Sequence, residues 1–123
     1  MKRDFSLFIK DILEAIDDIE NFIADADFET FSADKKTRAA VVHEIEIIGE
    51  ATKNIPASVR TKHKELPWKD MAKMRDKVTH FYFGVNYEIV WKVVKERLPA
   101  IKVAAKKILS DLAEKTSQDK DKS

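Results

Sequence analysis

Apolar residues recur at intervals of three and four along most of this chain, and that spacing limits the fold to α-helices. The first stripe consists of Phe5, Phe8, Ile9, Ile12, Ile16, Ile19 and Ile23. Residues spaced in this way lie on one face of a helix and can be buried together. The 123 residues include only 2 glycines and 3 prolines, too few for the many turns of a β-sandwich or barrel. The sequence therefore predicts an all-α protein.

The first half of the chain is expected to form two long helices. The stripe just described predicts a helix over about residues 4–26, and a second stripe predicts another over about 32–54. Ser32 is the expected N-cap of the second helix, and Pro56 should break or bend the chain after it. Residues 56–66 fit either a short helix or an irregular connection, and the sequence does not decide between them.

The second half is expected to add two or three helices. Pro67 and Trp68 should open the first of them, because proline suits the first turn of a helix, and it should continue to about Tyr82. Asn86 is the expected cap of the next helix, which Pro99 should bend or restart before it ends near residue 115. The prediction is an antiparallel bundle of four to five helices.

Length and composition predict one domain. A chain of 123 residues has the size of one ordinary domain, so residues 1–115 should form a single helical unit and the polar residues 116–123 a flexible tail. The absence of cysteine excludes disulfides, thiolate nucleophiles and cysteine-ligated metals. The N-terminal stretch is polar and amphipathic, so neither a signal peptide nor a membrane span is predicted, and a cytoplasmic location is expected.

The net charge of +1 conceals an uneven distribution. Residues 1–34 carry three bases and ten acids, whereas the segment Arg60–Lys77 carries seven bases and three acids. The basic segment fits a surface that binds phosphates. It equally fits a neighbour that packs against the acidic first helix. Charge alone leaves both interpretations open.

The common signatures of enzymes are absent from the chain. A di-metal site in a helical bundle would need Glu-x-x-His on two helices, and the chain has only the reversed pair His43 and Glu46. Two scattered glycines cannot form a phosphate-binding loop, and no recognisable turn places a serine beside a histidine. The sequence therefore predicts neither a metal site nor a cofactor.

One cluster does combine groups suited to RNA chemistry. It reads Arg75-Asp76-Lys77-Val78-Thr79-His80-Phe81-Tyr82. Arginine is permanently charged and binds phosphate oxygens through two N–H groups, and histidine exchanges a proton near neutral pH. Such groups can cleave RNA without a metal. A base withdraws the 2′-hydroxyl proton, the oxygen attacks the adjacent phosphorus, and a cation stabilises the transition state.

The spacing within this cluster does not by itself bring the two groups together. On a regular helix Arg75 and His80 lie roughly 140° apart, because five residues turn through about 500°. Convergence requires a helix that loosens near His80, or a second copy of the chain that completes the site. Asp76 and His80 share a face, so Asp76 could orient the imidazole and favour its protonated form. A structural role, with Arg75 paired to an acid of the first helix, is the alternative.

The segment Met74–Trp91 resembles the signature region of the HepT-like HEPN toxins, whose core is arginine, four residues, histidine, any residue and tyrosine. Other parts of the chain agree with that family in order and spacing, over about residues 3–110. They are Asp11–Ile16, Phe31 and Asp34, Ile47–Ala51, and Pro67-Trp68. The short motif alone arises by chance, but the ordered set is specific.

The resemblance implies a HEPN-like helical homodimer that acts as an endoribonuclease toxin and needs no metal or cofactor. Arg75 would stabilise the phosphate and His80 would move protons, with Asp76 in a supporting position where the family often has asparagine. The implied partner is an MntA-like nucleotidyltransferase antitoxin, which transfers AMP from ATP to the motif tyrosine, here Tyr82. A bulky anion on Tyr82, two residues from His80, would block the cleft and compete for Arg75.

Three lysines of the same segment, Lys69, Lys73 and Lys77, recur every four residues and predict one basic ridge. The ridge fits contact with RNA or with an acidic partner, and simple solvation is the alternative. Two other functions stay open for the chain as a whole. It could be a non-catalytic helical module that binds a nucleotide or a nucleotidyltransferase, or a structural subunit whose charged helices serve assembly.

Overall fold

The computed structural model describes the backbone of residues 4–79 and 86–121, and every regular element in these ranges is a helix. The elements are α1 (Phe5–Ile23), α2 (Phe28–Ala33), α3 (Lys35–Lys53), α4 (Ala57–Lys62), α5 (Trp68–Thr79), α6 (Tyr87–Lys92), the π-helical turn η1 (Val93–Arg97) and α7 (Leu98–Asp121). The predicted all-α class is confirmed for this part of the chain. Because α6, η1 and α7 form one uninterrupted helical run, the described elements amount to six helices. The prediction was four to five, and the number is higher because the short helix α2 is separate from α3.

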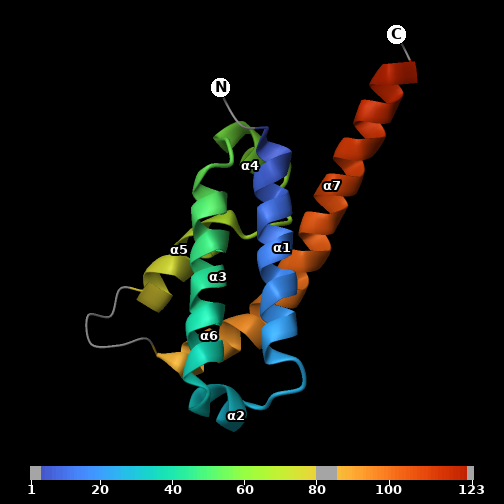
Figure 1. Ribbon diagram of the computed structural model, residues 1–123. Helices are drawn as coiled ribbons and strands as arrows, with labels where there is room; N and C mark the ends of the chain where they lie inside the picture. Colours follow the sequence, from blue (N-terminus) through green and yellow to red (C-terminus); the bar gives the residue numbers. More distant parts are fainter. Residues whose placement is uncertain (1–3, 80–85, 122–123) are drawn as a thin grey trace.

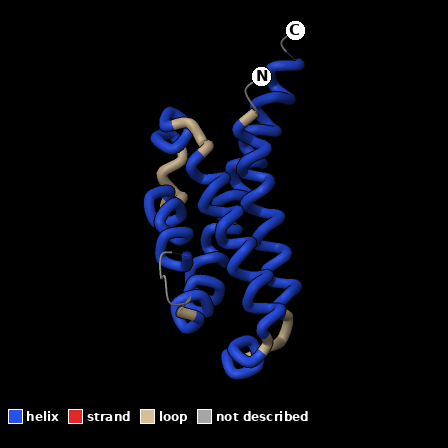
Figure 2. Tube along the Cα trace, turned by 60° about the vertical axis from the view of Figure 1, so that its left-hand side comes forward, coloured by secondary structure: helices blue, strands red, loops and turns tan. Residues whose placement is uncertain are grey.

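The core lies between α1 and α3, which run side by side in opposite directions (Figure 1). The isoleucine stripe of α1 is buried, and it meets Val41, Ile45 and Ile48 of α3, which are fully buried as well. Helix α5 packs on α3, and α7 packs on α1. In Figures 1 and 2 the C-terminal part of α7 projects beyond the other helices. The helical period therefore predicted the buried faces correctly.

The acidic first helix has a basic partner in α7. Lys102 Nζ lies 2.8 Å from Glu20 Oε2 and 3.1 Å from Asp17 Oδ1. The hydrogen bond to Glu20 and the one to Asp17 raise the pKa of Lys102. Part of the negative charge of α1 is therefore offset by a lysine of α7. Because Lys102 lies outside the basic segment Arg60–Lys77, both interpretations of that segment stay open.

The predicted helix over 32–54 is two helices, because the chain turns at Asp34. Asp34 has an extended backbone (φ −96°, ψ 93°), and its carboxylate accepts hydrogen bonds from the Thr37 N–H (3.1 Å) and Thr37 Oγ1 (2.7 Å). It therefore caps α3, and the prediction of Ser32 as the N-cap was wrong. Asp27 caps the short α2 in the same way, accepting from the Thr30 N–H at 2.8 Å.

The last α-helix begins beside Pro99, at Leu98, in keeping with the predicted restart, although the helical run itself is not interrupted. Pro99 lies near the beginning of α7, and the irregularity precedes it, in η1, where the Leu98 N–H donates to the Val93 carbonyl five residues back. A π-helical turn widens the backbone and disturbs the regular i to i−4 pattern. The missing N–H of a proline is therefore tolerated just after it. Helix α7 then continues to Asp121, past the end predicted near residue 115.

The segment left open between Pro56 and Leu66 contains the short helix α4. Asn86 caps α6 as predicted, accepting from the N–H groups of Glu88 (3.0 Å) and Ile89 (3.3 Å). Among the described residues, no helix combines the length and the apolar character that crossing a bilayer would require.

Candidate functional site

Helix α5 carries the first half of the arginine–histidine motif, and its beginning is tightly held. Trp68 is buried, and its indole Nε1 donates a hydrogen bond to the His63 carbonyl at 2.8 Å. Met71 and Met74, on the following turns, are buried against α3. Trp68 thus has a packing role, and α5 is held firmly against α3.

The structure brings only part of the predicted site into view. Arg75 lies in α5, directly after buried Met74, and Asp76 is exposed on the next position. His80 and Tyr82 lie outside the described residues, so the convergence of Arg75 with His80 and the support from Asp76 stay predictions. The three lysines of the predicted ridge all belong to α5, and Lys69 and Lys73 are exposed.

An aromatic cluster holds helix α6 against α2. The Tyr87 ring packs edge-on against Phe31 of α2 at 6.3 Å, and the Trp91 ring lies 5.1 Å from Phe31 and 6.2 Å from Phe28. The guanidinium of Arg38 stacks over Tyr87 at 4.5 Å. Helix α5 is therefore anchored on α3, and α6 is anchored on α2. Trp91, like Trp68, has a packing role.

A basic groove lies between α4 and α5. Four cationic residues line it, together with small or buried neutral ones, and no described lining residue is acidic. The cationic residues are Arg60, Lys64, Lys69 and Lys73. The sequence predicted Lys69 and Lys73 as one ridge, but it did not show that Arg60 and Lys64 form the opposite wall. The signal for the whole groove was the excess of bases between residues 60 and 77.

An acidic groove lies on the other side of α3, against α1. Asp11, Glu14 and Asp18 line it from α1 and Glu44 from α3. Glu44 is 9 % exposed, and burial raises the pKa of its carboxyl, with a further contribution from the neighbouring Asp18. The sequence gives no sign of this role for Glu44, because Asp18 and Glu14, which act on its carboxyl, come from a different helix.

Replacing Glu44 by glutamine is expected to stabilise the protein near neutral pH by up to about 1 kcal/mol. A carboxyl whose pKa is raised by folding favours the folded state when protonated, so its contribution is lost as the pH rises through the folded pKa. The gain in the variant should therefore shrink as the pH falls toward the ordinary glutamate value of 4.5. Thermal unfolding at several pH values measures this difference. The matched control is Glu46→Gln on the same helix, and an equal pH effect there would contradict the assignment.

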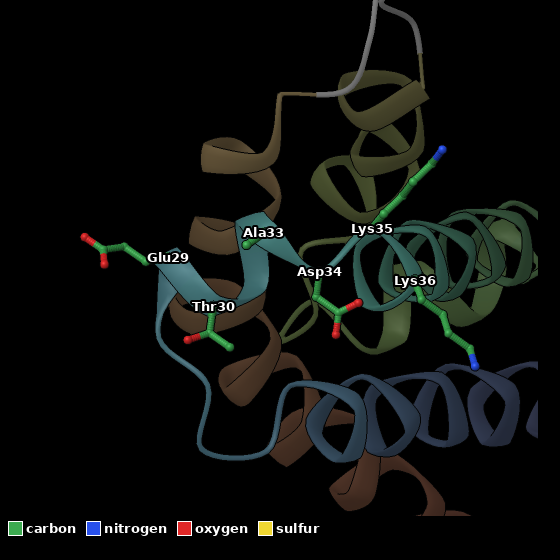
Figure 3. Close-up of a pocket in the computed structure, with 6 residues that line it drawn as sticks. All are labelled: Glu29, Thr30, Ala33, Asp34, Lys35 and Lys36. Carbon is green, nitrogen blue, oxygen red and sulfur yellow. The ribbon is translucent and has the colours of Figure 1, made fainter.

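A third hollow, at the junction of α2 and α3, has mixed charge. Figure 3 shows Glu29 directed away from the two lysines, and Lys35 and Lys36 directed to different sides of α3. Asp34 in its centre is engaged by Thr37, whose hydroxyl and N–H lower the pKa of that carboxyl. Its polar groups are used to cap α3, so this hollow is a structural feature of the turn. In the described ranges no three histidine or acidic side chains gather as a metal site.

Residues 12–108 match the family model described as ribonuclease HepT-like. A protein of Thermococcus cleftensis named "Probable ribonuclease HepT" is 51 % identical over 102 residues, which is 83 % of this chain and 93 % of that protein. One of Methanocaldococcus jannaschii named "Putative RNase MJ0125" is 47 % identical over 93 % of this chain and 98 % of its own length.

The similarity also extends to bacteria. A protein of Caldanaerobacter subterraneus named "Putative RNase TTE0752" is 40 % identical over 83 % of this chain and 91 % of its own length. No solved structure matches the chain significantly. The family model extends from within α1 to within α7 and includes the motif positions Arg75, His80 and Tyr82. The chain therefore belongs to the HepT-like ribonuclease family.

Proposed function

We propose that this protein is an endoribonuclease that needs no metal and serves as the toxin of a toxin–antitoxin pair. The observation that carries the proposal is membership of the HepT-like family over residues 12–108, a range that includes Arg75 and His80. Relatives that match nearly over their full length bear names of ribonucleases. The position of Arg75 on a firmly packed helix suits a residue that must hold a phosphate in place.

The proposed reaction uses the RNA's own 2′-hydroxyl as nucleophile. His80 withdraws the hydroxyl proton, a bond forms between the 2′-oxygen and the adjacent phosphorus, and the bond from phosphorus to the 5′-oxygen breaks. The departing oxygen takes up a proton, so the products are a 2′,3′-cyclic phosphate and a 5′-hydroxyl. Arg75 stabilises the negative charge that builds up on the phosphate, and Asp76 orients the imidazole.

The proposed active form is a homodimer, in which the motifs of two copies face one cleft. The support is geometric, since a regular helix holds residues 75 and 80 roughly 140° apart. A second copy supplies the missing group without any distortion of the helix. Helices α5 and α6, which precede and follow the motif histidine in the sequence, are each held by contacts of their own.

The proposed regulation is adenylylation of Tyr82 by an MntA-like nucleotidyltransferase antitoxin. The Tyr82 hydroxyl attacks the α-phosphorus of ATP, an ester bond to AMP forms, and pyrophosphate leaves. The product places an anion two residues from His80. That anion competes with the RNA phosphate for Arg75 and fills the space that the substrate needs.

The proposal is tested by incubating the purified protein with RNA in the presence of EDTA. We expect cleavage to continue at the rate found without the chelator, and the new ends to carry 2′,3′-cyclic phosphate. Cleavage that EDTA abolishes and added magnesium restores would overturn metal independence. Failure to cut RNA at high protein concentration, with binding to the nucleotidyltransferase intact, would overturn catalysis and support the non-catalytic binding module.

A further inference from the structure

We propose that the groove between α4 and α5 binds the sugar–phosphate backbone of single-stranded RNA beside the helix that carries the motif arginine. This inference rests on the proposed function. The groove has a volume of about 660 Å³ and is lined by Arg60 and Lys64 on one wall and by Lys69 and Lys73 on the other. Helices α4 and α5 are joined by a short loop (Figure 2), so both walls belong to one local unit.

No described residue that lines the groove is acidic, so none of them offsets the positive charge of the four cations. Four like charges around one groove repel one another. The nearest acid of the connecting loop, Glu65, is engaged by His63 at 3.4 Å. An arrangement of this kind gains stability when an anion enters, and a polyanion neutralises all four charges at once.

Arg60 adds a second observation. Its Nε is buried and has no hydrogen-bond acceptor among the described residues. A buried donor without an acceptor costs free energy, and phosphate oxygens are acceptors that arginine binds through two N–H groups. A phosphate in the groove would supply acceptors to the Arg60 guanidinium and remove part of that cost.

The other two hollows described above are lined by acidic residues, so they are less suited to RNA than this groove. The hollow between α1 and α3 presents Asp11, Glu14, Asp18 and Glu44, which repel phosphates. The hollow at the α2–α3 turn has both signs of charge. Of these three hollows, the one between α4 and α5 is lined by cationic residues and by no acidic one.

The proposed ribonuclease function favours RNA over an acidic protein as the occupant of the groove. Lys69 and Lys73 line the groove from α5, the helix that also carries Arg75. Because successive residues of a helix turn through about 100°, Arg75 stands about 160° round the helix from Lys73. RNA held in the groove therefore reaches the motif by passing round α5. Lysines contact phosphates as point charges, so we expect binding with little sequence preference.

The test measures binding separately from cleavage. The probe is a fluorescent single-stranded 2′-O-methyl RNA, which lacks the nucleophile and is not cut. We compare wild type with Arg60→Gln/Lys64→Gln and with Lys69→Gln/Lys73→Gln over a range of salt. Each pair should weaken binding about 25-fold at about 0.1 M salt and lower the salt slope by about 1.4, because each phosphate contact contributes about 0.7.

The matched control is Lys35→Gln/Lys36→Gln, which removes the same charge from exposed positions at the other end of α3. It should bind as wild type does, and circular dichroism should show all variants folded. Groove pairs that bind no worse than the control would overturn the inference, even if wild type cuts RNA. A loss of binding by the groove pairs would support it, even if wild type cuts no RNA. Loss of binding to the nucleotidyltransferase alone would assign the groove to that partner and overturn RNA binding.

Discussion

Replacement of Arg75 or His80 by alanine is expected to reduce RNA cleavage by about a thousandfold each, which is the range for loss of a charge-stabilising or proton-transferring group. The reason is chemical. Without Arg75 the negative charge of the transition state lacks its cation, and without His80 no group takes the 2′-hydroxyl proton. Cleavage of a fluorescent RNA by the purified variants measures both effects, and growth on expression in a host cell should recover in parallel.

The controls for this experiment are residues of the same type elsewhere in the chain. Arg97 in η1 and His43 in α3 are both exposed, so Arg97→Ala and His43→Ala remove the same groups without touching the motif. Both should cut RNA at the wild-type rate. All four variants should elute from a size-exclusion column at the volume of the wild type. Undiminished cleavage by both motif variants would remove Arg75 and His80 from the catalytic site.

The class of fold and the buried faces follow from the sequence because they depend on local spacing. Ile9, Ile12, Ile16 and Ile19 fall on one side of any regular helix, and all are fully buried in the structure. The first and last residues of each helix are harder to predict, because neighbouring residues that can cap a helix compete for that position. Both Ser32 and Asp34 are capping residues, and Asp34 prevails because Thr37 offers it two donors.

Pro99 shows that tertiary structure also decides how a helix continues past a proline. A proline ordinarily ends a helix, but a widened π-helical turn in front of it makes room for it. That turn is formed by η1 and depends on how η1 packs, with Val93 and Val94 buried against the rest of the protein. The rule for proline is local, whereas the exception is set by the tertiary structure.

The candidate site shows the same contrast between features that depend on local spacing and features that depend on tertiary structure. The order of Arg75, His80 and Tyr82 is visible in the sequence, because a motif is a matter of spacing. The basic groove and the acidic groove are not visible in this way. Arg60 and Lys73 line one groove from two helices, and Glu44 and Asp18 line another from two others, so both groupings depend on how α-helices pack. Sequence spacing can identify a motif, whereas a surface formed by two helices can be recognised only from the fold.

Replacement of Tyr82 by phenylalanine is expected to abolish the transfer of AMP from ATP, because the variant lacks the hydroxyl that attacks the α-phosphorus. Radiolabelled ATP and the partner nucleotidyltransferase measure this directly, and mass spectrometry locates the modified peptide. RNA cleavage by the variant should stay within a few-fold of wild type, since the phenol takes no part in the proposed proton transfers. The variant should therefore be toxic even when the antitoxin is present.

The chain offers one matched control, because Tyr87 is its only other tyrosine. The Tyr87 ring stacks beneath Arg38 and against Phe31, and Tyr87→Phe retains both ring contacts. That variant should accept AMP and be neutralised as wild type is. If instead Tyr82→Phe is labelled and Tyr87→Phe is not, the modified hydroxyl is the one at the start of α6. AMP would then act by displacing Arg38 from the aromatic cluster, and neutralisation would work through the anchoring of α6 rather than by competition for Arg75.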